Sequence, residues 1–156
     1  MNAELSADLL RLLRARTTAA LGTLREGAPF VSMVPYALAA DGFILHASKL
    51  AAHTRDMLAD TRVSLLVAQA EGGGTSALAL KRVTVQGQAR RVPAASPDHA
   101  GLKAVYLERF PDAEPMFGFA DFSIFLVRPE SARFVAGFGQ AHSLGGESLK
   151  QLLQQR

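Results

Sequence analysis

The stretch Phe43–Val67, FILHASKLAAHTRDMLADTRVSLLV, decides the fold. It begins with apolar residues that predict a strand over 43–46, and it ends with a second predicted strand over 62–67. Between the strands, apolar residues from Leu50 to Asp60 recur near helical spacing, and Ser48 precedes them as a candidate helix N-cap. A helix N-terminus offers free amide donors and a partial positive charge. The segment therefore predicts an anion-binding corner where a strand passes into a helix.

Three side chains at this corner strengthen the prediction: the hydroxyl of Ser48, the ammonium of Lys49 and the imidazole of His53. A phosphate needs many hydrogen-bond donors and positive charge, and a helix start with such groups supplies both. The alternative is that Ser48 only caps the helix and that Lys49 and Arg55 are solvated, because serine caps are common. The spacing alone leaves both interpretations open.

The rest of the chain reads as strands with single inserted helices. The predicted helices span 6–16 with Ser6 as its cap, 50–60, 96–110 with Ser96 as its cap, and 149–155; the predicted strands span 18–24, 30–36, 43–46, 62–67, 82–92 with a break at Gly87, 122–127 and 133–139, with a hairpin at Asp41-Gly42 and a turn at Pro129. Six or seven strands in this order predict a mainly β fold, a Greek-key-like antiparallel barrel with flanking helices, as a single domain over residues 1–156.

Composition excludes several classes of function. The 156 residues are 49% hydrophobic and contain no cysteine, which excludes disulfides and thiolate chemistry and fits a reducing cytoplasm. The net charge is only +3, and the basic clusters Lys81-Arg82 and Arg90-Arg91 are too small for a nucleic-acid stripe. The four histidines are scattered, so we expect no metal site. No apolar stretch is long enough for a membrane span, and the N-terminus does not resemble a secretory signal. We therefore expect a cytoplasmic protein without nucleic-acid or membrane partners.

Two motifs carry a resemblance to a known family. SKLAAHTRDM at 48–57 with VSLLV at 63–67, and GFADF at 118–122 leading to RFVAGFGQA at 133–141, are similar to segments of the pyridoxamine 5'-phosphate oxidase-like FMN-binding split barrels. Within that family the chain most resembles the HugZ-type haem-utilisation branch. The resemblance covers about residues 8–145, and the order and spacing of the motifs are more specific than either motif alone.

The resemblance implies an FMN held at the interface of a homodimer. The implied cofactor contacts are the second strand through its backbone at Ser32, Met33, Val34 and Pro35, the phosphate corner at Ser48, Lys49, His53 and Thr54 with Arg55 as an addition, Arg82 near a family glutamine position, and Gly137, Phe138 and Gly139 beside the partner's flavin. For Met33 the alternative is a place in the core, for Arg82 a solvated charge, and for the glycines a turn or bulge. The apolar strands 122–127 and 134–138 also favour dimerisation, because they offer more apolar surface than a small barrel needs.

The implied function is an FMN-dependent oxidoreductase acting on an unknown small substrate, with no catalytic side chain assigned because the flavin supplies the redox chemistry. The alternatives are a non-enzymatic module that binds or stores flavin or haem, and a barrel that holds a deazaflavin. The chain has no tryptophan, so it lacks the arrangement with which the true oxidases grip pyridoxal phosphate. It also lacks the further C-terminal domain usual in HugZ-type haem degraders. We therefore expect neither vitamin B6 oxidation nor haem breakdown.

Overall fold

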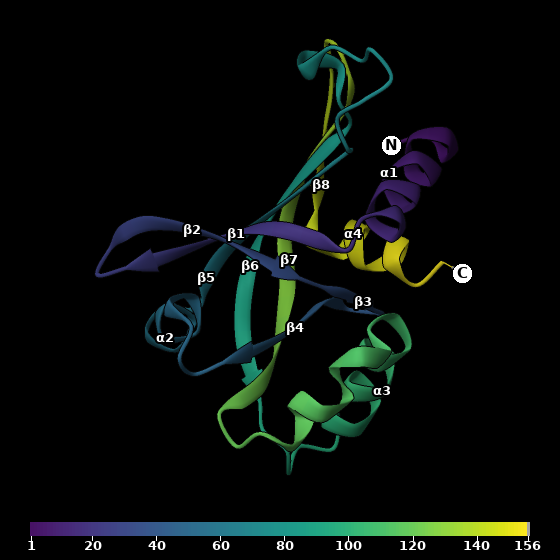
Figure 1. Cartoon of the computed structure of the whole chain (residues 1–156). Helices are drawn as coiled ribbons and strands as arrows, with labels where there is room; N and C mark the ends of the chain where they lie inside the picture. Colours follow the sequence, from purple (N-terminus) through teal and green to yellow (C-terminus); the bar gives the residue numbers. More distant parts are fainter. Residues whose placement is uncertain (156) are drawn as a thin grey trace.

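The computed structural model describes residues 1–155 and shows a mainly antiparallel β structure with helices around it (Figure 1). In this range eight strands form one sheet, in the order β2-β1-β5-β6-β7-β4-β3 with β8 on β7. Their bounds are β1 Thr18–Arg25, β2 Ala28–Pro35, β3 Ala37–Ala39, β4 Gly42–Ser48, β5 Arg62–Ala68, β6 Arg82–Val92, β7 Phe122–Gly137 and β8 Gln140–Gly145. Because β2 also contacts β4, the sheet closes on itself. The predicted fold class is confirmed, with one strand more than the predicted range.

Alternate residues of the strands fill the barrel interior. Leu21, Leu65, Val85, Phe125 and Phe134 are each at most 1% exposed and belong to one core cluster. Burying a side chain of this size stabilises the fold by about 1.5–3 kcal/mol relative to exposure. The barrel therefore has a packed interior, and its ligand sites must lie on its outer surface or at its ends.

The helices described over residues 1–155 lie outside the strands: α1 Ala3–Ala15, α2 Ala52–Ala59, α3 His99–Arg109 and α4 Gly146–Leu153, with short 3-10 helices η1 Ala77–Ala79 and η2 Pro111–Gly118. α1 and α4 lie side by side in Figure 1, and Leu9, Leu13 and Leu149 pack into the barrel core. The prediction of a Ser6 cap is wrong, because Asn2 Oδ1 accepts a hydrogen bond from the Leu5 amide at 2.9 Å and starts α1 earlier. None of these helices is long and apolar enough to cross a membrane.

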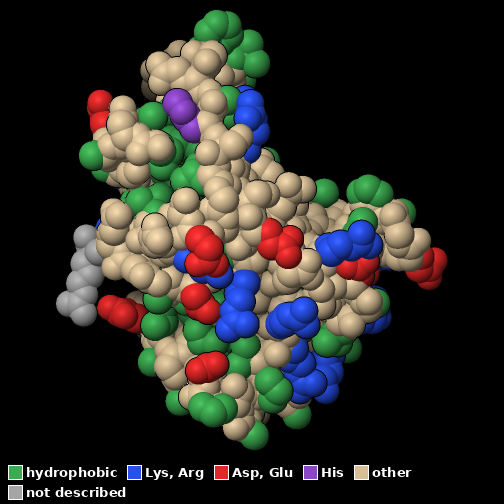
Figure 2. All heavy atoms as spheres, turned by 180° about the vertical axis from the view of Figure 1, so that it is seen from behind, with side chains coloured by type: hydrophobic (Ala, Val, Ile, Leu, Met, Phe, Trp, Pro, Cys, Tyr) green, Lys and Arg blue, Asp and Glu red, His purple; other side chains and the backbone are tan. Residues whose placement is uncertain are grey.

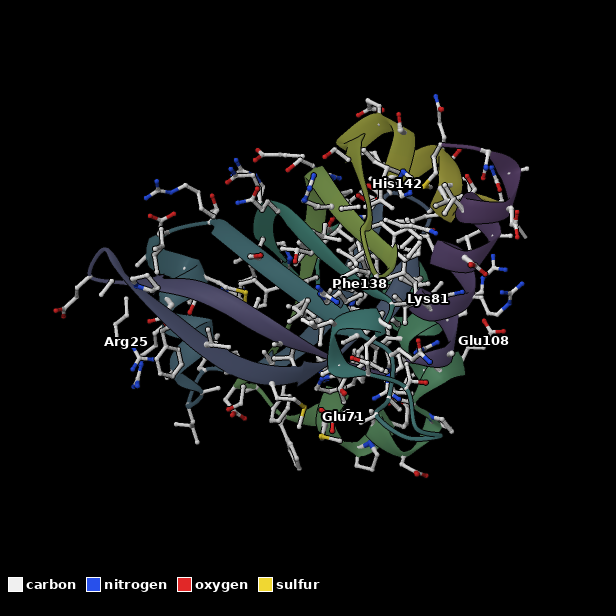
Figure 3. The ribbon with its side chains drawn as sticks, turned by 90° about the horizontal axis from the view of Figure 1, so that it is seen from above. Arg25, Glu71, Lys81, Glu108, Phe138 and His142 are labelled. Atoms are coloured by element: carbon white, nitrogen blue, oxygen red, sulfur yellow. The ribbon has the colours of Figure 1, made fainter. Side chains whose placement is uncertain are left out.

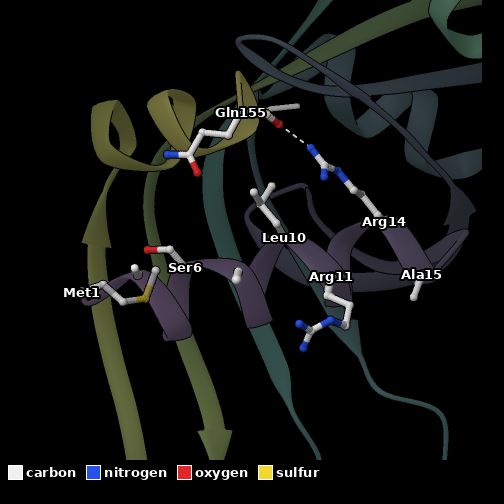
Figure 4. Close-up of a pocket in the computed structure, with 9 residues that line it drawn as sticks. Met1, Ser6, Leu10, Arg11, Arg14, Ala15 and Gln155 are labelled. Carbon is white, nitrogen blue, oxygen red and sulfur yellow. Dashed lines mark hydrogen bonds between the residues drawn. The ribbon is translucent and has the colours of Figure 1, made fainter.

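A hydrogen bond connects α1 to the segment that follows α4. Arg14 donates a hydrogen bond to the main-chain carbonyl of Gln155, as the close-up of the groove along this helix shows (Figure 4). α4 starts at Gly146, before the predicted 149–155, so its buried Leu149 and Leu152 lie in the middle and last turns. This contact and the packing of α1 on α4 hold both termini on one side of the barrel.

β6 and β7 are the longest strands of the sheet, with 11 and 16 residues, and β6 pairs with β7 along its whole length. The pairing register shifts between Gln86 and Gly87, which confirms the predicted break. Gly87 is paired with Pro129, so the proline lies at the bulge, where the ladder is already interrupted. The prediction of a turn at Pro129 is therefore wrong, and the two strands predicted on either side of it are one continuous strand.

Three glycines approach the backbone of this part of β7. A Cβ atom on Gly87 would lie 2.1 Å from the carbonyl oxygen of Arg128, and one on Gly42 or Gly146 would lie 2.2 Å from a carbonyl oxygen of the same segment. Real Cβ atoms do not come so close to backbone oxygen, so all three positions exclude a side chain without movement of the main chain. The close packing of β4, β6 and α4 around this segment depends on these glycines.

α2 does not start at Ser48. Ser48 is the last residue of β4, and its hydroxyl accepts a hydrogen bond from the Leu50 amide at 3.1 Å in the turn that follows. The cap position of α2 is Ala51, which offers no side-chain cap. The predicted Ser48 cap is therefore wrong, since three residues separate the strand from the first helical residue.

α2 is fixed to β1 through a buried carboxylate. Asp56 accepts hydrogen bonds from the Thr23 hydroxyl at 2.8 Å and from the Arg25 guanidinium at 3.2 Å. The Arg25 hydrogen bonds and the Thr23 hydroxyl hold the pKa of Asp56 below its usual value. Arg25 also lies over the ring of Phe30, 3.6 Å from its centroid, where a cation–π contact is favourable.

α3 and η2 cover the outer side of β3, β4 and the first half of β7. Tyr106 of α3 forms a second buried cluster with Ile44, Ile124 and Leu126. Most of the apolar strand 122–127 is therefore buried within one chain, whereas in the strand 134–138 Phe134 is buried and Phe138 is exposed. Homodimerisation stays a prediction. α3 begins at His99, later than the predicted start with Ser96 as cap, because Ser96 belongs to a turn whose carbonyl accepts from the His99 amide at 3.1 Å.

Candidate functional site

The strand register places one continuous face of the sheet outside the barrel, on β2, β1, β5, β6, β7 and β8. We call it the outer face. Its middle row consists of Met33, Ala20, Leu66, Thr84, Arg133 and Ser143, and the neighbouring rows contain Val31, Gly22, Ser64, Gln86 and Ser131 on one side and Ala68, Arg82, Val135 and Ala141 on the other. Because facing residues of paired strands share a side of the sheet, these side chains form a single surface.

The β2 and β5 part of the outer face is apolar and open. Val31 is 66% exposed, Met33 68% and Leu66 40%, and the β1 residues between them are the small Ala20 and Gly22. Large apolar side chains grouped on a surface mark a place that a ligand or another protein covers. We call Val31, Met33 and Leu66 the apolar strip. Met33 is therefore not a core residue.

The β6–β8 part of the outer face is hollowed and cationic. A cleft of about 650 Å³ lies there, with Arg82, Arg133, Ser143 and Leu66 in its lining. Arg82 donates to the Leu80 carbonyl and Arg133 to the Ser143 hydroxyl, each at 3.0 Å. Within residues 1–155 no carboxylate forms an ion pair with either arginine. Both guanidinium groups keep donors for an anion, because each carries five N–H bonds.

The residues of the predicted phosphate corner do not all face one site. The Ser48 hydroxyl donates to the carboxylate of Asp121 at 2.6 Å, and Lys49 is exposed while its amide donates to the Asp121 carbonyl at 2.7 Å. A phosphate at Ser48 would have to displace a carboxylate. Arg55 is exposed on α2, and Thr54 is buried with its hydroxyl oxygen unpartnered within the described chain.

His53 and Ser32 do come together. The Ser32 hydroxyl lies 3.1 Å from His53 Nδ1, which links β2 to α2. Partial burial lowers the pKa of His53, and the nearby Asp56 opposes that shift. A histidine whose pKa is lowered is neutral at pH 7 and provides one donor and one acceptor rather than a positive charge.

The remaining predicted residues of β2 point to different sides. Met33 lies on the outer face, Val34 is buried in the barrel core, and Pro35 is exposed at the end of the strand. The alternation of strand side chains explains this division. Only the backbone of this strand could contact one ligand along all four positions.

Gly137, Phe138 and Gly139 form the turn between β7 and β8, where Gly137 pairs with Gln140. Gly139 has a φ of 73°, which favours glycine, and Phe138 is 76% exposed. The hairpin projects beyond the barrel in Figure 1, and Figure 2 shows hydrophobic side chains at the tip of this lobe. Figure 3 labels Phe138 there, and His142 on β8. The turn that the sequence left as an alternative is observed.

Sequence reasoning did not find Arg133 and Leu66 as site residues. Their signal is the register of three strands, which aligns Leu66 with Thr84 and Thr84 with Arg133. Asp121 was part of a quoted motif without a role, and the structure places it against Ser48. Alternation along each strand could have indicated the outward residues, but not which strands are neighbours.

A family model described as pyridoxamine 5'-phosphate oxidase matches residues 5–136, and the chain belongs to this family. Two curated relatives are named heme oxygenases, and together with the family match they confirm the resemblance in the sequence. The chain is 38% identical over 130 residues to the chloroplastic non-canonical heme oxygenase HOZ of Arabidopsis thaliana, covering 83% of this chain. It is 28% identical over 151 residues to the heme oxygenase HutZ of Vibrio cholerae, covering 96% of this chain and 86% of HutZ.

The structures agree with this assignment. A heme binding protein from Mycobacterium smegmatis superposes with a TM-score of 0.86 at 28% identity, covering 96% of this chain and 61% of that protein. The structure of HutZ, described as a heme storage protein, gives a TM-score of 0.75 at 26% identity, covering 81% of this chain and 90% of HutZ. The chain spans 38% of the length of the plant relative. The FMN expected from the family resemblance is not confirmed, because these relatives are named for haem.

Proposed function

We propose that this protein binds haem on the outer face of its sheet. The observation that carries the proposal is the apolar strip beside two arginines that have no acidic partner among residues 1–155. Haem combines a flat apolar ring with two carboxylates, so its site needs an apolar platform and cations at one edge. The names of the relatives support the same ligand.

The register supports a fit between this face and one haem. Leu66 and Arg133 are two strands apart in the same row, a separation of about 10 Å at the usual strand spacing. The ring would contact Met33 and Leu66, and Arg82 and Arg133 would bind the carboxylates by charge-assisted hydrogen bonds. Bound haem would supply iron-centred redox chemistry, for which proteins provide His, Cys, Met or Tyr ligands.

The test is a titration of the purified chain with hemin, followed by the visible absorption of the complex. We expect the variant carrying both Arg82→Gln and Arg133→Gln to bind about tenfold more weakly or worse, because two charge-assisted contacts are lost. Arg62→Gln is the matched control. Arg62 lies on the same side of β5 as Leu66, but it is paired with Asp60 at 2.6 Å. Hemin affinity equal in the double variant and the control would contradict the proposed site.

Haem breakdown is the second function to test, because both curated relatives are named heme oxygenases. The expectation against it relied on a further C-terminal domain, yet HutZ carries that name and is covered over 86% of its length by this chain. The assay supplies the hemin complex with a reductant and dioxygen and follows loss of the haem absorption. A complex whose spectrum persists would assign the chain to haem binding or storage.

FMN and homodimerisation remain predictions. A parallel titration with FMN, comparing the chain with a Ser48→Ala, His53→Ala double variant, tests the phosphate corner; tight FMN binding without hemin binding would replace the haem proposal. A second copy laid on the apolar strip would cover Met33, and light scattering of the Met33→Lys variant tests that contact. We expect the wild type to be a dimer and the variant to shift towards monomer, because a charge replaces a buried contact.

A further inference from the structure

A second cleft lies at the other end of β6 and β7. It measures about 250 Å³ and lies between the end of β6, the start of α3 and the segment 117–124. Its lining includes His46, Arg91, His99, Phe117, Phe119 and Phe122. Arg91 follows Arg82 by nine residues along β6, or about 30 Å of extended strand, so this cleft is separate from the outer-face cleft.

Aromatic rings form much of this wall. The ring of His46 is stacked on that of Phe117, with centroids 3.8 Å apart and an interplanar angle of 6°. Phe122 lies 5.1 Å from His46 by ring centroids, and Phe119 is 54% exposed at the rim. Offset and edge contacts between rings at such distances are favourable. A flat ring entering the cleft would meet apolar faces and edges on several sides.

The polar groups of the wall favour an anion. Arg91 lines the cleft and has no ion-pair partner among residues 1–155. No aspartate or glutamate is part of the lining. Two carboxylates from the neighbouring segment are engaged elsewhere, since Asp121 accepts from Ser48 at 2.6 Å and Glu114 pairs with Lys103 at 3.2 Å.

His46 provides a neutral donor. Burial, with help from the nearby His99 and Lys103, lowers the pKa of His46 to about 4. The neutral ring carries one N–H, and neither His46 nitrogen takes part in a side-chain hydrogen bond within residues 1–155. An acceptor in the cleft could therefore bind His46 and Arg91 together.

We infer that this cleft binds a small aromatic carboxylate, whose ring lies among Phe117, Phe119 and Phe122 and whose carboxylate accepts from Arg91 and His46. The volume suits a single ring with one or two substituents and is too small for a tetrapyrrole. The inference does not depend on haem binding, because it uses no residue of the outer face.

The experiment is an amide NMR titration of the full chain with benzoate and, in parallel, with benzamide, its neutral analogue. We expect saturable benzoate shifts at residues 46, 91 and 117, with dissociation in about the millimolar range for so small a ligand. Benzamide should bind at least about fivefold more weakly, because it lacks the charge that Arg91 recognises.

Two variants with matched controls complete the test. Arg91→Gln should weaken benzoate about tenfold, whereas Arg90→Gln, one residue away and outside the lining, should leave it within about twofold. His46→Phe keeps the stack on Phe117 and removes the donor, so it should weaken benzoate while His142→Phe should not; the amide spectrum of each variant confirms folding. No saturation by about 10 mM benzoate, shifts confined to the outer face, or equal effects of the two arginine variants would each overturn the inference.

Discussion

Replacing Thr23 with valine should destabilise the protein by about 2 kcal/mol. The Thr23 hydroxyl donates to the Asp56 carboxylate at 2.8 Å, and the two residues are only 3% and 6% exposed. Valine keeps the shape of the side chain and removes the donor, and water cannot replace it at this depth. A hydrogen bond to a charged group contributes about 1.5–3 kcal/mol, and the Arg25 contact to the same carboxylate remains.

Urea unfolding measures this effect. With a slope of about 2 kcal/mol per molar for a domain of this size, the midpoint should fall by about 1 M at pH 7. Thr23→Ser retains the hydroxyl and is the control for the change in side-chain volume. If Thr23→Val and Thr23→Ser had midpoints within about 0.2 M of each other, the hydrogen bond would not contribute as the structure indicates.

The same variant has a pH signature. The pKa of Asp56 is below its usual value of 3.8 in the fold, so the stability that its charge contributes is present above pH 3.8 and is lost as the pH falls through the folded pKa. Without Thr23 the carboxylate has fewer donors and its pKa is less depressed. The difference between Thr23→Val and the wild type should therefore shrink in acid, and a difference that stays constant from pH 7 down to the pH at which both proteins unfold would contradict this reasoning.

Two further changes test the packing and the burial of a tyrosine. Gly87→Ala should lower the thermal midpoint by several degrees, because its Cβ would lie 2.1 Å from the Arg128 carbonyl oxygen. The control is Gly101→Ala in α3, where a Cβ meets nothing within 4 Å and the midpoint should stay unchanged or rise; similar midpoints for the two variants would refute the close approach. Burial raises the pKa of Tyr36 to about 12, so the wild type should lose stability relative to Tyr36→Phe between about pH 10 and 12, as the unfolded chain ionises first, and parallel alkaline unfolding curves for the two proteins would refute this.

The sequence predicted the strands best where the apolar pattern was strong. The predicted strands 18–24, 62–67 and 82–92 match β1, β5 and β6 within about two residues, and the break at Gly87 is a real bulge. β8 was missed because QAHSLG lacks the β-branched and aromatic residues typical of strands; only its pairing with β7 holds it extended.

Local rules failed where tertiary pairing decided the outcome. Pro129 is a turn former by its own chemistry, but the bulge opposite Gly87 accommodates it within a strand. Ser48 has the composition of a helix cap, but its hydroxyl serves Asp121, 73 positions later in the chain. The outer face is a product of register between strands, which no single segment contains. The candidate phosphate corner could be proposed from sequence, and the arginine pair of the outer face could not.

The three glycines around residues 127–130 have a consequence for how this chain can change over evolutionary time. Because these glycines have no side chain, backbone packs directly against backbone at all three positions, and this contact fixes the spacing of the elements around residues 127–130. A larger side chain elsewhere in the interior can be compensated by a smaller neighbouring side chain. Here the contacting atoms belong to the backbone, so no substitution of a neighbour can make room. Insertions and larger side chains should therefore accumulate in the hairpin tips and in the segment from 69 to 81, while the three glycines and residues 127–130 stay unchanged.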